Sequence, residues 1–398
     1  MDWSPRTQSR MLAVMTIMEI PTTHAHWTGA DSGGHWLLTA EQLAPTLCDA
    51  AVEADSNGTF VAAQIAELRR QGLTAMLVPD ELGGGGASFR DTCAVLAELA
   101  HGCPSTSLTL SMHSHLVAAQ VWRHLRELPA PALAKVAGGA VLVSTGASDW
   151  MESNGSSTRV DGGYRVTARK SPASGAPAGD VVVTSFRHDG AEGAQVVHAS
   201  VPFAAPGVSI EQTWDAMGMR ATGSDTVVFD DVFVPDAAVA LVRPAGQWHP
   251  VWATVLGVAM PLIMSTYVGV AEAAANRAVE LARPRAERPD IAPLIGRMGN
   301  RLTVARDTVR AMIDAADDLR FDNTLDHASL CLARKTNAAE AVVDVVRLAM
   351  EVSGGHGFGR GSGIERLFRD AHGAAYHPLP AAQQELFSGR VALGMPPF

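Results

Sequence analysis

The chain has 398 residues, of which 47% are hydrophobic and 18% are charged, so it can bury a large core and form two or three domains. Its 31 lysines and arginines are outnumbered by 41 aspartates and glutamates, which gives a formal net charge of -10, and no basic cluster interleaved with aromatic residues occurs. This composition argues against a nucleic-acid partner.

The first 37 residues are predicted to be a loosely ordered extension. Their apolar stretch, residues 11–20, is short, contains Glu19 and is not followed by a convincing signal-peptide cleavage site. The cysteines form neither a C-x-x-C pair nor a spacing suited to zinc, so no metal site is predicted and the thiols are expected to be reduced, as in a cytoplasmic protein. They are Cys48, Cys93, Cys103 and Cys331.

Residues 38–140 are predicted to form an α-helical domain. Thr39 and Gln42 are spaced as a capping box, in which two side chains bind the free backbone N–H groups at the start of a helix. Ser88 is placed to cap a second helix.

Residues 141–245 have a different residue pattern. Valine, threonine and phenylalanine alternate with polar residues in short runs, and turns rich in glycine, aspartate and proline separate these runs. Four such runs are residues 164–167, 181–186, 195–201 and 226–234. Their close spacing predicts a small antiparallel β-barrel or sandwich as the central domain.

Residues 246–398 are predicted to form a helical bundle domain. The longest apolar run, residues 251–270, approaches membrane-spanning length, but Pro261 and the polar side chains of Thr254, Ser265 and Thr266 favour a buried core helix. A later helix over residues 328–352 is expected to stop at the glycines that follow it.

An apolar residue recurs at alternating steps of four and three along residues 298–319, which predicts a long helix with one apolar stripe. The stripe consists of Met298, Leu302, Ala305, Val309, Met312, Ala316 and Leu319. A stripe this long and narrow packs against other helices, either within the chain or across an oligomer interface.

Four stretches of the sequence resemble motifs of one family, in the same order. Residues 78–84 read V-P-D-E-L-G-G, close to V-P-E-E-x-G-G, while residues 218–220 and 230–235 read G-M-R and D-D-V-F-V-P, close to G-x-R and E-D-V-x-V-P. Residues 354–358 and 365–371 read G-G-H-G-F and E-R-L-F-R-D-A, close to G-G-x-G-F and E-R-x-x-R-D-A. The chain thus resembles the acyl-CoA dehydrogenase superfamily. This resemblance implies an α+β multidomain fold with an N-terminal helical domain, a central β-domain and a C-terminal four-helix bundle.

The base that a dehydrogenase of this family needs is missing from its expected place. The resemblance implies a glutamate that removes the α-proton of an acyl thioester while a hydride passes to the flavin, but His377 and Pro378 occupy the matching positions. A minority of relatives supply the base from the first helix of the C-terminal domain. Residues 237–271 and 371–384 contain no aspartate or glutamate, so neither location for the base is filled.

The resemblance also implies that the ADP half of FAD is bound more weakly than in a dehydrogenase of the family. Arg285 matches the arginine of the family's R-x-x-F-G turn, but Arg288 and Pro289 replace the Phe-Gly pair of that turn. Gly296 and Glu351 stand where glutamines are expected. A carboxylate near a pyrophosphate is repulsive. The cofactor is therefore expected to be FAD or FMN, bound loosely enough to arrive reduced from a separate flavin reductase.

A monooxygenase branch of the superfamily uses such a flavin. Its members bind reduced flavin, add dioxygen at C4a and transfer one oxygen from the hydroperoxyflavin to a small molecule. The resemblance places Ser174, followed by Gly175, near flavin N5 and implies that His377-Pro378 replaces the Tyr-Glu pair of the dehydrogenases. Imidazole suits this place, because its pKa near neutral pH lets it polarise a hydroxyl or pass a proton.

Other candidate contacts rest on the same resemblance. His113, or its neighbour His115, lies on a helix that faces the flavin in relatives, so His113 is a third catalytic candidate beside Ser174 and His377. Four more residues are candidate cofactor contacts in addition to Ser174 and Gly175: Arg220, Arg285, Gly354 and Gly355.

Each of these assignments has a structural alternative. His377 could cap the segment before it, with Pro378 starting the last helix, and Ser174 could be a turn residue only. At least one histidine of the pair at 113 and 115 should be an ordinary surface or core residue, and Arg220 could pair with Asp215 on the surface.

Three aromatic residues are candidates for the wall of an apolar pocket that takes a flat substrate. They are Trp150, Trp252 and Tyr376. Scattered aromatic residues more often belong to the core, which is the alternative interpretation.

The sequence thus predicts a two-component monooxygenase that acts on a small-molecule substrate with O2 and reduced flavin. Two alternatives stay open: an acyl-CoA dehydrogenase with a displaced base, and a non-catalytic member that binds flavin or thioester. No membrane partner is expected. Because relatives pair through their C-terminal helices, the resemblance implies a homodimer or homotetramer.

Overall fold

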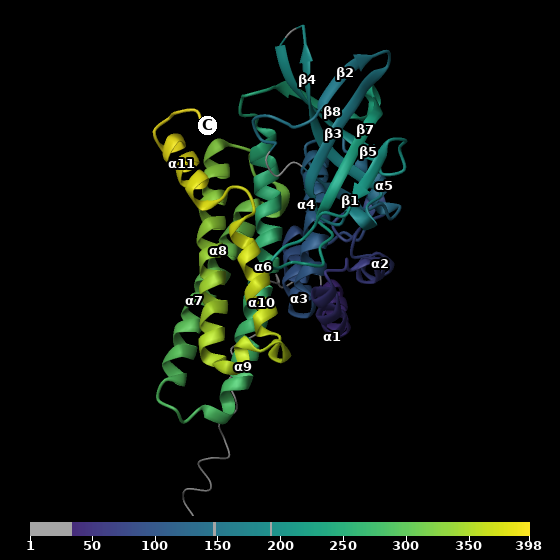
Figure 1. Ribbon diagram of the computed structural model, residues 1–398. Coiled ribbons are helices and arrows are strands. Elements are labelled where there is room, and N and C mark those ends of the chain that lie inside the picture. The colour runs from purple at the N-terminus through teal and green to yellow at the C-terminus, as the bar shows by residue number, and fades with distance from the viewer. Residues whose placement is uncertain (1–33, 146–148, 192) are drawn as a thin grey trace, which may run out of the picture.

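The computed structural model describes residues 34–145, 149–191 and 193–398, in which helices come first, strands second and long helices last (Figure 1). Of the predicted extension, residues 1–37, the first 33 lie outside the described residues and the last four belong to the first helix. The N-terminal helices are α1 (Gly34–Asn57), α2 (Ala62–Arg70), α3 (Phe89–Gly102), α4 (Pro104–His124) and α5 (Ala132–Ala137).

The two predicted helix starts of this domain have different outcomes. Ser88 is the N-cap of α3, and its side chain accepts a hydrogen bond from the backbone N–H of Asp91, as predicted. The capping box at Thr39 is wrong, because α1 begins at Gly34 and the Thr39 hydroxyl donates to the carbonyl of His35 inside the helix at 2.8 Å.

The central domain is one eight-stranded sheet. Seven strands follow the order β6-β7-β3-β2-β4-β5-β8, and β1 lies outside this order and pairs with β4. The strands are β1 (Leu142–Ser144), β2 (Ser156–Val160), β3 (Gly163–Ala173), β4 (Val181–Gly190), β5 (Gly193–Pro202), β6 (Val208–Glu211), β7 (Asp225–Pro235) and β8 (Val239–Pro244). Most neighbours are antiparallel, but β1 and β2 both pair with β4 in parallel, so the sheet is mixed and the purely antiparallel prediction is corrected.

All four strand runs read from the sequence fall inside strands, namely β3, β4, β5 and β7. These are the longest strands, and their inward side chains form an apolar core of their own, centred on Val166, Val182, Phe186, Val197 and Phe229. The remaining strands are shorter, which explains why their alternation was too brief to read.

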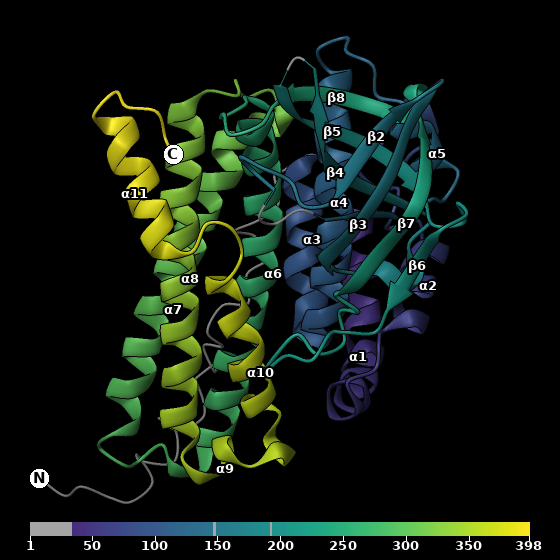
Figure 2. The same ribbon diagram turned by 45° about the horizontal axis from the view of Figure 1, so that its top comes forward.

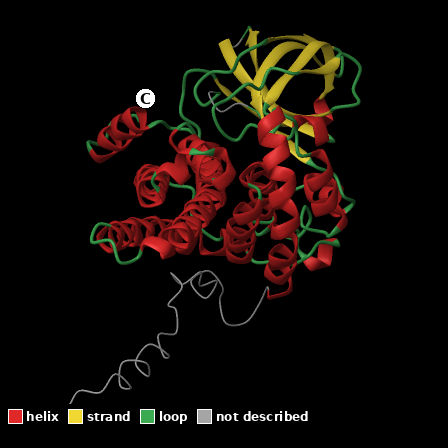
Figure 3. Ribbon diagram, turned by 60° about the horizontal axis from the view of Figure 1, so that its bottom comes forward, coloured by secondary structure: helices red, strands yellow, loops and turns green. Residues whose placement is uncertain are grey.

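The C-terminal domain contains three long helices, α6 (Val251–Ala282), α7 (Ile291–Ala316) and α8 (Leu325–Ser353), together with α9 (Gly355–Phe358), α10 (Ile364–Ala371) and α11 (Ala381–Ala392). Figures 2 and 3 show that the strands gather on one side of the molecule, while α3 and α4 stand between the sheet and the C-terminal helices. The short α10 packs on α6 and α8, so the expected four-helix bundle consists of three long helices and one short helix.

Two predictions about the long helices are confirmed: α6 is a buried core helix, and α8 ends at Ser353, directly before Gly354. In the described chain, the helical segment at residues 251–285 alone is long and apolar enough to cross a membrane, but 94% of its most apolar window is buried inside the protein. The helix α6 is therefore a core helix.

The apolar stripe on α7 and the turn after it is buried, and α7 packs against α8 and α6 of the same chain. Helices within the chain therefore account for the stripe, and it gives no support to an oligomer. The dimer or tetramer stays a prediction that light scattering would check.

A buried charge cluster joins α3, α6 and α7 away from the sheet. The ring of His101 lies 3.2 Å from a carboxylate oxygen of Glu98 and 3.1 Å from one of Glu272, and Arg306 donates to the other oxygen of Glu272 at 2.6 Å. Burial alone would lower the pKa of His101, but the two carboxylates outweigh burial and raise that pKa to about 9.

This cluster predicts a loss of stability in mild alkali. Protonated His101 stabilises the fold fully below its unfolded pKa of about 6.5, and this contribution disappears as the pH rises towards 9. We expect the free energy of unfolding, measured with urea, to fall by about 3 kcal/mol over that range, at about 1.4 kcal/mol per pH unit. His101→Gln should flatten this slope, and an equally steep slope in that variant would contradict the assignment.

Candidate active site

A cavity of about 460 Å³ lies where the sheet, α4, α6 and the segment after α10 meet. This volume is within the range of about 300–1,000 Å³ that is usual for small-molecule and cofactor sites. Most of the wall is apolar, and the polar side chains that line it are Ser144, Thr145, Ser174, Thr222, Ser224, His115, His372, His377, Arg369 and the polar tips of Tyr267, Tyr376 and three tryptophans. In the described part of the chain, no aspartate or glutamate lines this cavity.

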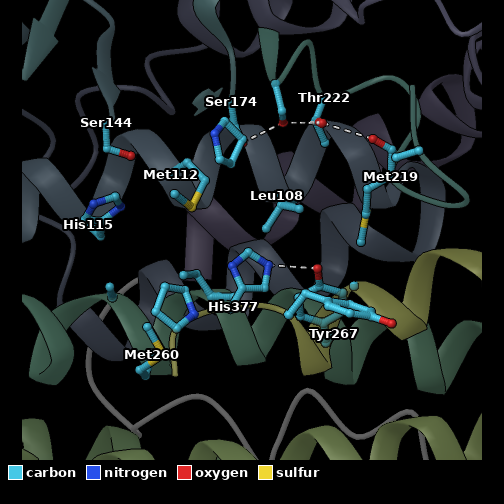
Figure 4. Close-up of a pocket in the computed structure, with 18 of the residues that line it drawn as sticks. Leu108, Met112, His115, Ser144, Ser174, Met219, Thr222, Met260, Tyr267 and His377 are labelled. Carbon is cyan, nitrogen blue, oxygen red and sulfur yellow. Dashed lines mark hydrogen bonds between the residues drawn. The ribbon is translucent and has the colours of Figure 1, made fainter. Parts of the chain in front are cut away.

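Two of the residues singled out from the sequence, Ser174 and His377, line the same cavity. Figure 4 shows Ser174 and Thr222 on one side of it and His377 with Tyr267 on the opposite side. The sheet supplies the first side, through the end of β3 and the segment before β7, and the C-terminal domain supplies the second.

The first side carries a row of three hydroxyl groups. The oxygens of Ser174 and Ser224 are 2.7 Å apart, those of Ser224 and Thr222 are also 2.7 Å apart, and Thr222 donates to the carbonyl of Met219 at 3.0 Å. Gly175, next to Ser174, has a left-handed φ of 79°, and a Cβ there would lie 2.9 Å from a methyl group of Thr109 on α4. Gly175 is therefore needed to bring the end of β3 close to α4.

The second side carries a hydrogen-bonded histidine and tyrosine. Nε2 of His377 lies 2.9 Å from the hydroxyl of Tyr267 on α6, and Nδ1 of the same ring forms no hydrogen bond within the described chain. Burial lowers the pKa of His377 to about 3 and raises the pKa of Tyr267, so both groups are neutral near pH 7. The expectation that this imidazole has a pKa near neutral pH is therefore corrected, and His377 can give or take a hydrogen bond in the cavity without carrying charge.

The loop that holds His377 is fixed by hydrogen bonds from a buried lysine. The ammonium group of Lys335 on α8 donates to the carbonyls of Ala375 and Leu379, at 3.3 and 3.2 Å, on either side of His377. Burial lowers the pKa of Lys335 to about 8. These two bonds fix the loop in place and thus the direction of the imidazole ring.

One face of α4 and one face of α6 form the apolar walls. Leu108, Met112 and His115 recur at steps of four and three along α4, and Met260 and Tyr267 lie two turns apart on α6. Burial lowers the pKa of His115 to about 4, so this ring is neutral as well.

The predicted aromatic wall is present. Trp150, Trp252 and Tyr376 all line the cavity, and the rings of Trp150 and Trp252 stack with their centroids 5.6 Å apart. Trp150 follows Asp149, which is fixed by a buried ion pair with Lys170 at 2.7 Å. This ion pair holds the beginning of the segment that carries Trp150 against the sheet.

His113, the third catalytic candidate, does not reach the cavity. It is buried, with Nε2 2.8 Å from the carbonyl of Thr74 and Nδ1 accepting from the backbone N–H of Leu142 at 2.9 Å. Both ring nitrogens thus bind backbone and none is left for a substrate. The structure gives His113 the role of joining α4 to β1, which corrects the catalytic prediction.

Arg220 also lies away from the cavity lining. It donates to the carbonyls of Asp55 on α1 and Ala216, at 2.8 and 3.1 Å, and lies 3.6 Å from the carboxylate of Asp215. The structural alternative for Arg220, pairing with Asp215, is therefore present. The candidate role of Arg220 as a cofactor contact stays a prediction.

Arg285 and Gly354 lie close together, Gly355 is the first residue of α9, and none of the three lines the cavity. The guanidinium of Arg285 donates to the carbonyl of Val352 at 2.7 Å, which caps the last turn of α8. Gly354 ends that helix with a φ of 59°. Their candidate roles as cofactor contacts stay predictions.

Several residues of the cavity were missed by the sequence interpretation. Ser224, Thr222 and Tyr267 were not singled out, and His115 was named only as the alternative to His113. The helical spacing of Leu108, Met112 and His115 was a usable signal, because it places His115 on the same face as its neighbours and His113 on another.

Comparison with known proteins follows the same division of the chain. Residues 38–127 match the N-terminal domain of acyl-CoA dehydrogenase, residues 144–232 match its middle domain, and residues 250–376 match its C-terminal domain. The chain belongs to the acyl-CoA dehydrogenase superfamily. It is therefore a flavin-dependent oxidoreductase, and the fold predicted from its motifs is confirmed.

Relatives of this superfamily member fall into more than one functional group. The amino sugar nitrososynthase DnmZ of Streptomyces peucetius is 28% identical, over 95% of this chain and 100% of its own. The mitochondrial short-chain specific acyl-CoA dehydrogenase of Bos taurus is 26% identical, over 91% and 88% of the two chains. The structure of KijD3 in complex with FMN and a dTDP-linked amino sugar is 28% identical, with a TM-score of 0.84 over 93% of this chain and 96% of that one.

The cavity of this superfamily member fits a flat polar ring such as that of a flavin. Ser144 Oγ and Trp252 Nε1 are buried in its wall and form no hydrogen bond within the described chain. Buried polar atoms of native proteins nearly always have partners, so these two can bind the polar atoms of a ligand. An isoalloxazine ring has both donor and acceptor atoms around an apolar body.

Proposed function

We propose that this protein is the oxygenase component of a two-component monooxygenase. It would bind reduced flavin, most simply FMN, supplied by a separate reductase. The flavin would provide two electrons, so that one atom of O2 enters a small organic substrate and the other leaves as water. The observation that carries this proposal is a cavity with no carboxylate in its described lining and a neutral imidazole where a dehydrogenase would hold its base.

The absence of a carboxylate matters because the α-proton of an acyl thioester needs a base that is ionised at neutral pH. His377 is neutral and has a depressed pKa, so it is a very weak base. It is better suited to orienting a substrate hydroxyl or amine through its free Nδ1. The apolar walls around it would exclude water, and Ser174 would hold the flavin edge from the other side.

One rapid-mixing experiment separates this function from its alternatives. The purified protein would be loaded with reduced FMN without oxygen and then mixed with O2 while oxidised flavin and hydrogen peroxide are followed. Bound flavin that reoxidises more slowly than free flavin, with delayed peroxide release, is the expected result. Reoxidation at the free-flavin rate, combined with bleaching of bound oxidised flavin by an acyl-CoA, would instead identify a dehydrogenase. If flavin binds and neither signal appears, the chain is a binding protein only.

Ser174→Ala tests the first side of the cavity. If the Ser174 hydroxyl holds the flavin edge, its loss should speed the appearance of oxidised flavin and peroxide up to about tenfold, the scale of one hydrogen bond. Ser353→Ala is a matched control, because Ser353 is a buried helix serine that donates to the carbonyl of Ala349 away from the cavity. Equal rates in wild type and Ser174→Ala would remove Ser174 from the mechanism.

A further inference from the structure

The row of hydroxyl groups at Ser174, Ser224 and Thr222 ends at a group that can only accept a hydrogen bond. That group is the carbonyl oxygen of Met219, 3.0 Å from the hydroxyl oxygen of Thr222. A hydroxyl has one proton to donate, and two oxygens at this distance attract each other only if that proton lies between them. The proton of Thr222 is therefore directed to Met219.

The direction at Thr222 sets the direction of the whole row. Since Thr222 donates to Met219, it must accept from Ser224 across 2.7 Å, and Ser224 in turn must accept from Ser174 across the next 2.7 Å. Ser174 thus uses its proton within the wall. What it presents to the cavity is a pair of oxygen lone pairs, which can accept a hydrogen bond and cannot donate one.

The carbonyl at the end of the row is held in place by two further donors. The indole N–H of Trp214 donates to the Met219 carbonyl at 2.9 Å, and the backbone N–H of Thr222 donates to it at 3.3 Å. The Met219–Arg220 peptide, which carries this carbonyl, therefore cannot turn to offer its N–H to the Thr222 hydroxyl. Within the described chain, no other side chain donates to the three hydroxyls, so nothing else competes to reverse the row.

We propose that this directed row makes the cavity selective for the reduced form of the flavin, and this inference rests on the function proposed above. Reduced flavin carries a hydrogen on N5 and can donate to Ser174, whereas N5 of oxidised flavin is an acceptor and would face lone pairs. Binding the oxidised form with equal strength would require all three protons to turn, which would leave the oxygens of Thr222 and Met219 facing each other at 3.0 Å without a proton. Thr222 and Ser224 are thus positioning residues that favour uptake of reduced flavin and release of oxidised flavin.

The test compares the affinities of the two redox forms. Dissociation constants for FMN and for photoreduced FMN would be measured without oxygen on the wild type and on Thr222→Val, which keeps the shape of the side chain and removes the hydroxyl. Without Thr222 as its acceptor, Ser224 can donate to Ser174 and free the Ser174 proton for the cavity. The preference of the wild type for reduced FMN should fall about fivefold, the scale of one hydrogen bond. For a two-electron couple, this corresponds to a midpoint potential of bound FMN lower by about 20 mV.

Thr92→Val is the matched control. Thr92 is a buried threonine on α3 whose hydroxyl donates to the carbonyl of Ser88 at 3.0 Å, and it does not line the cavity. Its replacement should leave the ratio of the two dissociation constants unchanged. Ser224→Ala interrupts the row at another point, so it tests the same inference if Thr222→Val fails to fold.

The outcomes separate the inference from the proposed function. Suppose that the wild type binds both forms and that the ratio of the two dissociation constants in Thr222→Val and in Ser224→Ala equals the wild-type ratio. The directed row is then not the source of any preference, and the inference is overturned. A wild type that binds neither form of FMN would overturn the proposed function itself. A ratio that falls in both variants of the row and not in Thr92→Val supports the inference.

Discussion

Replacing His377 by alanine is expected to lower product formation at least about tenfold, because the substrate would lose the hydrogen bond that orients it in the cavity. The reason is the position of the ring, which lines the cavity and bonds to Tyr267 through Nε2, while Nδ1 has no partner within the described chain. Folding should survive, because the change removes atoms from a cavity wall and the loop is still held by Lys335. Turnover with the reductase and a responsive substrate, together with the melting temperature, would measure both effects.

Tyr267→Phe is the control for this experiment. It removes only the hydroxyl that orients His377, so turnover should fall less than in His377→Ala, by about threefold to tenfold for one lost hydrogen bond. Turnover of His377→Ala equal to wild type would exclude His377 from the reaction. A tyrosine variant as slow as the histidine variant would assign the main role to Tyr267.

The pH profile of the wild type gives a second check on His377. Burial lowers the pKa of this ring to about 3, so it stays neutral from pH 5 to pH 8 and cannot produce an acidic limb near the usual histidine pKa of about 6.5. We therefore expect turnover to show no histidine-type loss between pH 7 and pH 5.5. Such a loss, present in the wild type and absent from His377→Gln, would contradict the neutral ring.

The fold was predictable because its signals are local. The four stretches of motif, the long strands and the apolar run of α6 each need only neighbouring residues to be recognised, and each lies in the predicted kind of element. The mixed sheet was not predictable in the same way. Pairing of β1 with β4 joins residues 39 positions apart, such as Leu142 and Val181, and no local pattern reports that contact.

The polar residues of the site were predictable only where the family resemblance names a residue that lines the cavity. Ser174 and His377 were found in this way, and the cavity brings them together. Arg220 was also found by its motif, yet its side chain donates to the carbonyl of Asp55 and does not line the cavity. The motif is explained by its other members, because Met219 binds α10 and supplies the carbonyl at the end of the hydroxyl row.

The choice between His113 and His115 depends on side-chain direction, which the motif search did not use. Side chains two positions apart on a helix differ by about 200° around its axis, so the rings of His113 and His115 must face nearly opposite ways. The structure sends His113 to the backbone of β1 and His115 to the cavity. Counting in steps of four and three from Met112 or Leu108 would have favoured His115.

Gly218→Ala is expected to be among the most damaging single substitutions in the chain. A Cβ at this position would lie 2.2 Å from the carbonyl oxygen of Arg369 and 2.7 Å from the amide nitrogen of Asp370, both in the backbone of α10. Real Cβ atoms never approach backbone this closely, and α10 cannot yield by turning a side chain. The segment around Gly218 must then move away from the helix.

That movement would break the contacts that tie the sheet to the C-terminal domain at this point. The Met219 N–H would lose the Asp370 carboxylate, and the Met217 carbonyl would lose the Arg369 guanidinium, which donates to it at 2.9 Å. We expect the free energy of unfolding to fall by about 3 kcal/mol, the upper end of the usual range for overpacking. Because Gly218 and its two neighbours line the cavity, binding of reduced FMN should also weaken.

Gly299→Ala is the matched control for this prediction. A Cβ at Gly299, on α7, meets no atom within 4 Å, so alanine there should stabilise the helix by up to about 1 kcal/mol. Urea unfolding followed by circular dichroism, with FMN binding measured on the same samples, would compare the two variants. If Gly218→Ala were as stable as wild type and bound reduced FMN equally well, the close contact between this segment and α10 could not be what shapes the cavity wall. The Met219 carbonyl, which sets the direction of the hydroxyl row, would then not be held in position by this contact.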